Sequence, residues 1–418
     1  MSVILMTSAA EGWCGSTVSD RVGPLTVVQV VSLVGGGGEF GGPTTVAVGL
    51  TRELSSRGHR VTLLALRVGD VGVPDGVPSS GWKVFPARRF VPGVGMLGLF
   101  NLRLAWCLWR SMRRADIVHL HAGRDLVSLV TLLLAALTNV PVVAQTHGMV
   151  RPRSSPLASL FDRVFVPLLR RARVVSFLTP DEEVDLRALL GSDAPLSALS
   201  NGLPLPPQPA SRDPSDTTPT VVFASRLHPV KRVVAFAEAA RILLDAGVDA
   251  DFVVYGPDQG QLDRLLEIVA EMGSSGRLRY GGALGHDETL TAMATGDVFV
   301  LPSSIDWAPM ALLEAMSLGL ACVCTHSCGL APAIERAEAG LVIDGDVVEI
   351  AEAVRRLVED PALARRLGEN ARDLVRREFS LAAIVDDLLR CYVAVLSPAT
   401  TSAATRSRPA SAERKSEA

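Results

Sequence analysis

Short apolar runs alternate with longer amphipathic segments along most of the chain. In the first half, runs rich in β-branched and aliphatic residues lie at 26–34, 59–66, 115–122, 140–148, 173–180 and 196–204. They lack polar–apolar alternation, which is typical of strands buried on both faces in a parallel sheet. Helices are expected at 44–58, 94–114 and 125–138. This order of strands and helices predicts a doubly wound α/β sheet.

The alternation stops at a polar segment, residues 205–219, and then starts again. This segment is rich in Pro, Ser and Asp, which is typical of a linker. After it, strands are expected at 220–227, 250–256, 277–282, 298–303, 321–325 and 341–345, with helices at 230–247, 259–273, 287–295, 309–318, 347–358 and 361–378. The second half therefore predicts a second Rossmann-like sheet.

Two Rossmann-like domains, residues 25–204 and 220–380, are expected to face each other across a cleft. The length of 418 residues suits two domains. The apolar helix at 381–396 is expected to pack back on the first domain. Residues 1–24 predict a flexible extension, and the Ser/Ala/Arg-rich residues 397–418 predict a disordered tail.

Charge and cysteine content narrow the functional classes. A net charge of −3 gives no overall field that attracts nucleic acid. The six cysteines contain no CxxC pair, which favours a reducing compartment. Cys322, Cys324 and Cys328 are interpreted as a buried strand entering a loop rather than as a zinc site. Because no signal peptide or spanning helix is predicted, we expect a cytoplasmic protein, with contact at the inner face of the membrane as an option.

The loop at residues 35–43, GGGGEFGGP, is the first candidate ligand-binding segment. It follows a predicted strand, at the edge where parallel sheets bind ligands. Its glycines allow the backbone to approach an anion, and the next helix N-terminus favours negative charge. An ordinary tight turn explains the loop equally well when it is taken alone.

Arg226 and Lys231, in the segment SRLHPVK, follow the first strand of the second half. Two cations near a helix N-terminus suit a diphosphate. The chain holds only three lysines, Lys83, Lys231 and Lys415, and arginine does not reproduce the compact charge of an ammonium group. The alternative is a pair of solvated surface charges.

Asp306 and Glu314 are eight positions apart in the segment LPSSIDWAPMALLEAM. A helix is expected to begin near Pro309, so Asp306 lies in the loop before it. The loop amides and the helix dipole suit phosphate or sugar hydroxyls, and Glu314 can accept hydrogen bonds from a ribose diol. The alternative is that Asp306 caps the helix and Glu314 is a surface charge.

Three histidines lie on two neighbouring predicted strands. His119 and His121 are two positions apart and therefore share one face of their strand, while His147 ends the next strand. No carboxylate or cysteine lies at metal-ligand spacing beside them. We interpret His119 as a core histidine and His147 as a hydrogen-bonding partner of the substrate.

In their order and spacing, these motifs together resemble the retaining GT-B glycosyltransferases of family 4. The resemblance covers residues 26–396. It is carried by the glycine-rich opening βαβ unit, by ADIVHLH, QTHG and SNGLP in the first half, and by FASRLHPVK and DWAPMALLEAMSLGLACVCT in the second. It implies two Rossmann-like domains that bind a nucleotide sugar between them.

The resemblance assigns roles residue by residue. It implies that Gly41 and Gly42 approach the donor phosphate and that Glu314 binds the ribose. It implies four catalytic residues: His147 at the donor hexose, and Asp306, Arg226 and Lys231 around the reacting diphosphate sugar. It further implies that the donor is contacted by Trp307, Ala308, Pro309 and Met310 and that His121 lies on the acceptor side. Asp306 is a departure, because the family has a glutamate here and aspartate is one methylene shorter.

The implied reaction transfers a hexose-type sugar from a nucleotide-diphosphate donor to an acceptor hydroxyl with retention of configuration. It implies no cofactor and no required metal. The acceptor is a carbohydrate, a lipid-linked molecule or a small molecule, in polysaccharide, glycolipid or glycosylated-metabolite assembly. Two alternatives stay open: a nucleotide-sugar epimerase of the same fold, and a non-catalytic nucleotide-sugar-binding partner protein.

The acceptor side carries a basic, apolar stretch at residues 95–114. From Lys83 to Arg173 the chain has 14 basic residues against three aspartates. Such a stretch suits contact with anionic membrane lipids and a lipid-linked acceptor. The alternative is a core helix with a solvated arginine face.

Overall fold

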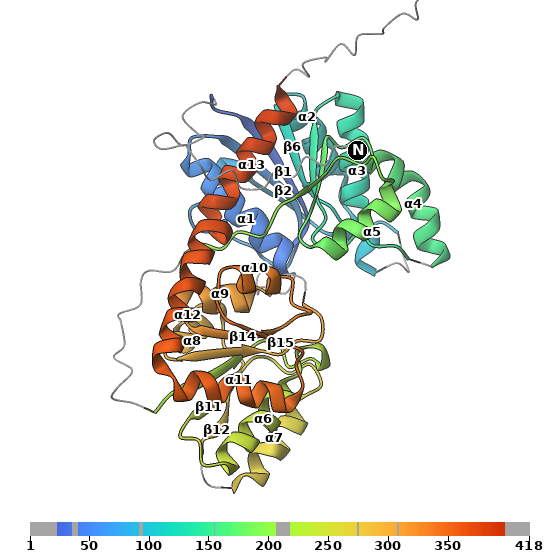
Figure 1. Ribbon diagram of the computed structural model, residues 1–418. Coiled ribbons are helices and arrows are strands. Elements are labelled where there is room, and N and C mark those ends of the chain that lie inside the picture. Colours follow the sequence, from blue (N-terminus) through green and yellow to red (C-terminus); the bar gives the residue numbers. More distant parts are fainter. Residues whose placement is uncertain are drawn as a thin grey trace, which may run out of the picture.

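The computed structural model describes residues 23–35, 41–91, 95–153, 155–205, 218–273, 276–306 and 309–397. Two parallel sheets form the centres of two lobes (Figure 1). The first sheet has seven strands in the order β3-β2-β1-β6-β7-β8-β9, and the second has six in the order β12-β11-β10-β13-β14-β15. Both orders reverse beside the first strand of the sheet, as in a doubly wound fold. The predicted fold class is confirmed.

The first domain alternates strands with helices. Its sheet strands are β1 (Thr26–Gly35), β2 (Arg60–Val68), β3 (Trp82–Pro86), β6 (Ile117–His121), β7 (Val142–Gln145), β8 (Val174–Phe177) and β9 (Leu196–Ala198). Its helices are α1 (Gly41–Ser56), α2 (Leu102–Met112), α3 (Leu126–Thr138), α4 (Pro156–Leu169) and α5 (Pro180–Leu190), with short turns η2 (Ser79–Gly81) and η3 (Gly95–Gly98). A small antiparallel ribbon joins β4 (Arg88–Arg89) to β5 (Leu99–Phe100).

Neighbouring residues of β1 enter two different cores, because successive side chains of a strand point to opposite faces. Val28 and Val30 pack with Leu104 and Leu108 of α2. Val27 packs with Leu50 of α1, on the other face. Helices therefore cover both faces of the first sheet.

The second domain repeats this plan around one continuous core. Its strands are β10 (Thr220–Ala224), β11 (Asp251–Tyr255), β12 (Leu278–Gly282), β13 (Val298–Leu301), β14 (Ala321–Thr325) and β15 (Leu341–Ile343). Its helical segments are η5 (Pro229–Lys231), α6 (Val233–Asp245), α7 (Leu262–Glu271), α8 (His286–Met293), α9 (Met310–Leu318), α10 (Ala331–Arg336), α11 (Val347–Glu359), α12 (Pro361–Leu374) and the π-helical turn η7 (Val375–Phe379). Cys322 and Cys324 lie in the buried strand β14.

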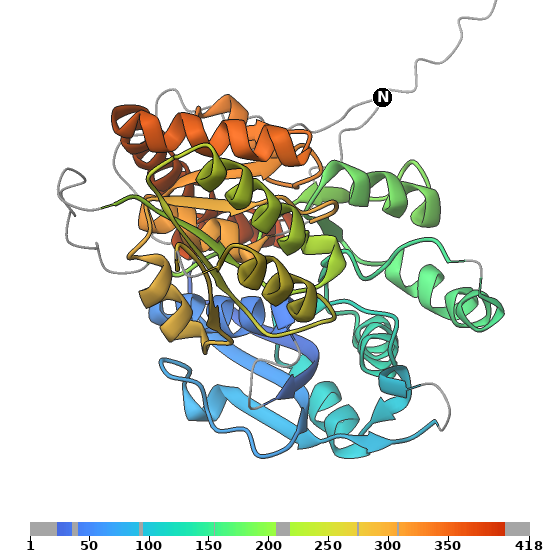
Figure 2. The same ribbon diagram turned by 90° about the horizontal axis from the view of Figure 1, so that it is seen from below.

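The last helix, α13 (Leu381–Leu396), lies against the first domain. Extended Ser380 separates it from η7, and its apolar side chains share a core with α1 and β1. Leu203 holds this crossing point, because its amide donates to the Phe379 carbonyl (2.9 Å) and its carbonyl accepts from the Leu381 amide (2.8 Å). Figure 1 shows α12 and α13 following one another along one side of both lobes, and Figures 1 and 2 place α4 and α5 on the opposite side of the first domain.

Several element boundaries differ from the predictions. The helix predicted at 94–114 is shorter, because Asn101 caps α2 by accepting from the Arg103 amide (2.9 Å) and residues 95–100 before it form η3 and β5. Strand β3 was missed; it is a short edge strand that ends in Pro86. The helix predicted at 230–247 begins at Val233, because Arg232 has a left-handed backbone (φ 57°). No helix within the described ranges is long and apolar enough to cross a membrane.

Candidate functional site

Lys231 and Asp306 form an ion pair at the carboxyl edge of the second sheet. The Lys231 ammonium donates to Asp306 Oδ2, and the two side chains are only 14% and 10% exposed. Lys231 follows β10 and Asp306 follows β13, and these two strands are neighbours in the sheet. The sheet order therefore brings together two residues that lie 75 positions apart in the chain.

Hydrogen bonds between three loops hold this pair in place. The Ser304 amide donates to the Val230 carbonyl (2.9 Å), which ties the Asp306 loop to the Lys231 turn. The Asp306 carbonyl accepts from the Gly329 amide (2.8 Å), which ties the same loop to the segment after β14. Thr325 Oγ1 also donates to the Ser303 carbonyl (2.6 Å). The carboxylate is thus positioned before any ligand arrives.

Lys231 lies just before the helix rather than at its start, where the sequence predicted it. It ends the η5 turn, and its amide donates to the His228 carbonyl (2.8 Å). Arg226 lies upstream of the same turn and is exposed, and its Nη1 donates to the neutral Gln259 Oε1 (3.3 Å). Among the described residues Arg226 forms no ion pair, so its full positive charge is available to an anion.

Glu314 lies in α9 and is only 9% exposed. Burial raises the pKa of its carboxyl, and the nearby His286 imidazole lowers it by a smaller amount. His286 Nδ1, from the start of α8, is 3.7 Å from Glu314 Oε1 and belongs to a largely exposed ring. The carboxylate oxygens therefore have capacity to accept hydrogen bonds from a pair of hydroxyl groups.

The other predicted donor residues are placed only in part. Pro309 is buried at the N-cap position of α9, and its carbonyl accepts from the Leu312 and Leu313 amides (3.0 and 3.1 Å). Met310 is half-buried at the first position of α9. Trp307 and Ala308 lie outside the described residues.

Gly41 and Gly42 form the first two positions of α1 rather than the loop before it. The sequence predicted that both glycines lie in a loop and that the helix starts at residue 44. The observed helix starts three residues earlier, at Gly41. A side chain on Gly42 would meet nothing within 4 Å. Amides in the first turn of a helix have no partner inside the helix, so this position still suits an anion.

His121 and His147 lie against each other in the first domain. His121 is fully buried at the end of β6, and its Nδ1 is 2.8 Å from Nε2 of His147, with the two rings within 14° of parallel. Its Nε2 is 3.3 Å from Oε1 of Gln29 on β1. The sequence assigned His121 to the acceptor side, and in the structure both of its ring nitrogens have side-chain partners.

The orientation of the Gln29 amide decides which ring nitrogen of each histidine carries the proton. Burial lowers the pKa of both histidines below its ordinary value, so both rings are neutral at pH 7. With the Gln29 amide oriented as in the structure, its oxygen can only accept, and His121 must donate from Nε2. His121 Nδ1 then accepts from His147 Nε2.

His147 Nδ1 is consequently left with a lone pair. Asn201 lies beside the ring and raises its pKa by less than burial lowers it, and Nδ1 has no well-aligned partner among the described residues. The atom is also buried in this structure, so it is not open to a substrate hydroxyl as the chain stands. Gln29 was not predicted from the sequence, because only the pairing of β1 with β6 brings it to His121.

His119 is a core histidine, as predicted. It is fully buried, and its Nδ1 is 2.9 Å from the Tyr392 hydroxyl of α13, while its Nε2 is 3.4 Å from Oε1 of Gln145. Burial lowers its pKa to about 4. The ring therefore helps to fasten α13 to the first sheet.

Glu182 is a buried residue beside His147 that the sequence analysis did not single out. His147 and Gly148 both have left-handed backbones (φ 50° and 71°), which is unusual for a histidine. Glu182 Oε1 accepts from the Gly148 amide and from Thr146 Oγ1 (2.5 Å each), and Oε2 accepts from the Leu178 amide (2.7 Å). This buried carboxylate holds the turn that carries His147. The sequence did contain one signal for the position of Glu182. Thr179 is a typical helix-capping residue, and its side chain caps α5, which places Glu182 in the first turn of that helix.

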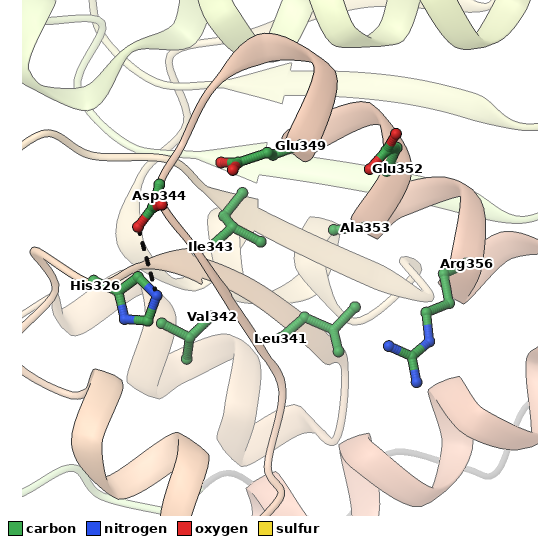
Figure 3. A pocket seen from close by; sticks show the side chains of 9 residues that line it. All are labelled: His326, Leu341, Val342, Ile343, Asp344, Glu349, Glu352, Ala353 and Arg356. Carbon is green, nitrogen blue, oxygen red and sulfur yellow. Dashed lines mark ion pairs between the residues drawn. The ribbon is translucent and has the colours of Figure 1, made fainter.

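A separate hollow of about 410 Å³ lies at the edge of the second sheet, between β15 and α11. Figure 3 shows His326 and Asp344 facing each other at one end of it (Nε2 to Oδ1 3.6 Å) and Arg356 at the other. None of the residues discussed above lines this hollow. The candidate functional residues at the strand ends therefore lie outside this hollow.

Comparisons with known proteins identify the family. The family model described as "Glycosyl transferases group 1" matches residues 207–374, and the one described as "Glycosyltransferase Family 4" matches residues 40–205. The 2-deoxystreptamine N-acetyl-D-glucosaminyltransferase of Streptomyces fradiae is 30% identical over 84% of this chain and 87% of its own length. The chain belongs to the group 1 glycosyltransferases. Alpha-D-kanosaminyltransferase of Streptomyces kanamyceticus is a further relative, 28% identical over 82% of this group 1 glycosyltransferase and 97% of its own length.

Solved structures agree on the fold of this group 1 glycosyltransferase. A glycosyltransferase from Rickettsia africae has a TM-score of 0.71 and 16% identity, over 90% of this chain and 99% of its own. Anabaena HepE in complex with UDP has a TM-score of 0.67 and 18% identity, over 88% of this chain and all of its own. Two Rossmann-like domains with these neighbours constitute the GT-B fold.

Proposed function

We propose that this glycosyltransferase moves a hexose-type sugar from a nucleotide-diphosphate donor to an acceptor hydroxyl, with retention of configuration and without a metal. The observation that carries the proposal is the cationic strand edge. Lys231 is held beside Asp306, and Arg226, on the same loop as Lys231, has no acidic partner among the described residues. A diphosphate brings the negative charge that such an arrangement lacks.

In the proposed reaction, the bond between the sugar and the diphosphate oxygen breaks and a bond to the acceptor oxygen forms. Arg226, Lys231 and the first amides of α1 stabilise the negative charge that develops on the departing diphosphate. The acceptor hydroxyl gives its proton to a departing phosphate oxygen. Asp306 keeps Lys231 in position, and His147 contacts the donor hexose.

Glu314 is proposed to hold the ribose. Two ribose hydroxyls can donate to its carboxylate, and the poor solvation of a 9%-exposed side chain strengthens such bonds. One relative is named for transfer to 2-deoxystreptamine and another for transfer of kanosamine, which favours a small-molecule acceptor. A lipid-linked acceptor is the second candidate, because helix α2 of the first domain exposes Leu102, Trp106 and Trp109.

The test is a thermal-shift panel with UDP, GDP, ADP, TDP and CMP, each with and without EDTA. We expect one diphosphate to raise the melting temperature selectively, with no change on adding EDTA. At 100 times the dissociation constant, a ligand stabilises the folded state by about 2.7 kcal/mol. No shift with any nucleotide would overturn the proposed donor site.

Once the base is known, NMR of the product's anomeric proton tests whether the configuration is retained. Formation of an epimerised donor in the absence of acceptor would instead show an epimerase.

Replacing Glu314 by alanine is expected to weaken binding of the selected nucleotide at least tenfold. The reason is that hydrogen bonds to a charged group are worth about 1.5–3 kcal/mol. Isothermal titration calorimetry measures the effect, with Glu369→Ala, an exposed glutamate of α12, as the matched control. Equal affinity of Glu314→Ala and the unaltered protein would remove Glu314 from the donor site.

A further inference from the structure

Helix α2 has two apolar faces. Leu104, Leu108 and Met112 are buried and pack into the core of the first domain. On the outward side, Leu102, Trp106 and Trp109 are 69%, 61% and 41% exposed. Positions i, i+4 and i+7 lie along one line of a helix, so these three side chains form a continuous stripe. The core explains the inner face but not the outer one.

Arginines surround the outward stripe. Arg110 lies over the Trp106 ring (5.7 Å to the centroid) and Arg113 over the Trp109 ring (4.9 Å). Trp109, Arg110, Arg113 and Arg114 line a shallow hollow of about 220 Å³. The cations therefore flank the apolar stripe instead of lying on a separate face.

The segment before the helix extends this surface. Phe90 is 60% exposed, and its ring meets the edge of Phe100 (6.0 Å between centroids) immediately before α2. Between Asp75 and Asp116 the chain has no acidic residue but has seven basic ones: Lys83, Arg88, Arg89, Arg103, Arg110, Arg113 and Arg114. The exposed aromatic rings therefore belong to a segment of the chain whose charges are all positive.

We propose that this outward face, formed by Phe90, Leu102, Trp106, Trp109 and the arginines around them, docks on an anionic lipid bilayer. Aromatic rings favour the boundary between headgroups and acyl chains, and arginines are attracted to anionic headgroups. A second copy of this chain fits the face poorly, because a two-fold contact would place the arginines beside the tryptophans against the same arginines of the other copy. If the proposed transfer reaction holds, docking would bring the first domain to a lipid-linked acceptor.

Vesicle sedimentation tests this docking with the full chain. Vesicles of phosphatidylglycerol mixed with phosphatidylcholine are compared with vesicles of phosphatidylcholine alone. We expect at least tenfold tighter binding to the anionic vesicles, which weakens as salt is raised. Equal binding to both kinds of vesicle, or binding to neither, would overturn the proposal.

Variants assign the binding to the α2 face. Trp106→Ser/Trp109→Ser is expected to lose tenfold or more of the binding to anionic vesicles. The matched control, Leu266→Ser/Val348→Ser, removes two exposed apolar side chains from the second domain (43% and 55% exposed) and should bind as the unaltered protein does. Equal losses in both variants would contradict the assignment. Loss of a dimer in light scattering on the tryptophan changes would also contradict it, since it would show self-association.

The nucleotide thermal shift separates this proposal from the proposed function. The tryptophan variant should keep both its melting temperature and its shift with the selected diphosphate, because α2 lies outside the donor site. A normal nucleotide shift without vesicle binding would overturn docking alone. Vesicle binding without any nucleotide shift would overturn the donor site alone.

Discussion

Lys231→Ala is expected to lower kcat by a factor of about 10²–10³, because removing one preplaced donor to a developing negative charge has effects of this size. Lys231 is the cation that the structure positions most firmly at the carboxyl edge of the second sheet, through Asp306 and the η5 turn. Binding of the nucleotide diphosphate should weaken as well. Steady-state kinetics with the donor identified by the nucleotide panel measure both effects.

The ion pair requires a second variant as control. In Lys231→Ala the Asp306 carboxylate is left buried without its partner, and breaking a buried pair costs about 3–5 kcal/mol of folding stability. The double change Lys231→Ala/Asp306→Asn removes that unpaired charge, so we expect it to recover stability but not activity. Lys83→Ala, at an exposed position of β3, should change neither. Wild-type kcat in a folded Lys231→Ala protein would exclude Lys231 from catalysis.

Glu182→Gln is expected to lower the free energy of unfolding by about 1.5–3 kcal/mol, the range for a hydrogen bond to a charged group. The carboxylate accepts from Thr146 Oγ1 and the Gly148 amide at one oxygen and from the Leu178 amide at the other. Glutamine has a single acceptor oxygen, so its amide group must face at least one of these donors. Urea unfolding measures the loss.

The same change should reduce turnover, because Glu182 holds the left-handed turn that aims His147. The neighbouring Glu183 supplies a matched control. Its carboxylate pairs with Arg187 one helical turn away and is about one-third exposed, so Glu183→Gln should cost less than about 1 kcal/mol. If both variants unfold alike and keep full turnover, the turn does not depend on Glu182.

Local patterns were sufficient for the architecture. Buried strands leave apolar runs, and their alternation with helices predicted two doubly wound sheets, which the structure contains. The end of a helix or strand was harder to predict, because single residues decide it. Asn101 shortens the helix predicted at 94–114, and the left-handed Arg232 moves Lys231 out of α6.

The contacts within the site depended on which strands are neighbours. Lys231 and Asp306 meet because β10 pairs with β13, and Gln29 reaches His121 because β1 pairs with β6. From the sequence, Lys231, Asp306, His121 and His147 were each assigned a role without the partner that the structure shows, because spacing along the chain contains no information about such pairs. The role of Glu182 likewise depends on the packing of α5 beneath the turn after β7.

The sequence by itself determined the two-domain α/β fold, the family, and the strand ends at which the candidate donor residues lie. These follow from periodicity and from motifs in a fixed order, which are local properties of the chain. Only the tertiary structure decided that Asp306 pairs with Lys231, that His121 lies against His147, and that the tryptophans of α2 point outward. Each of these depends on distances between side chains that are far apart in sequence, and folding alone sets such distances.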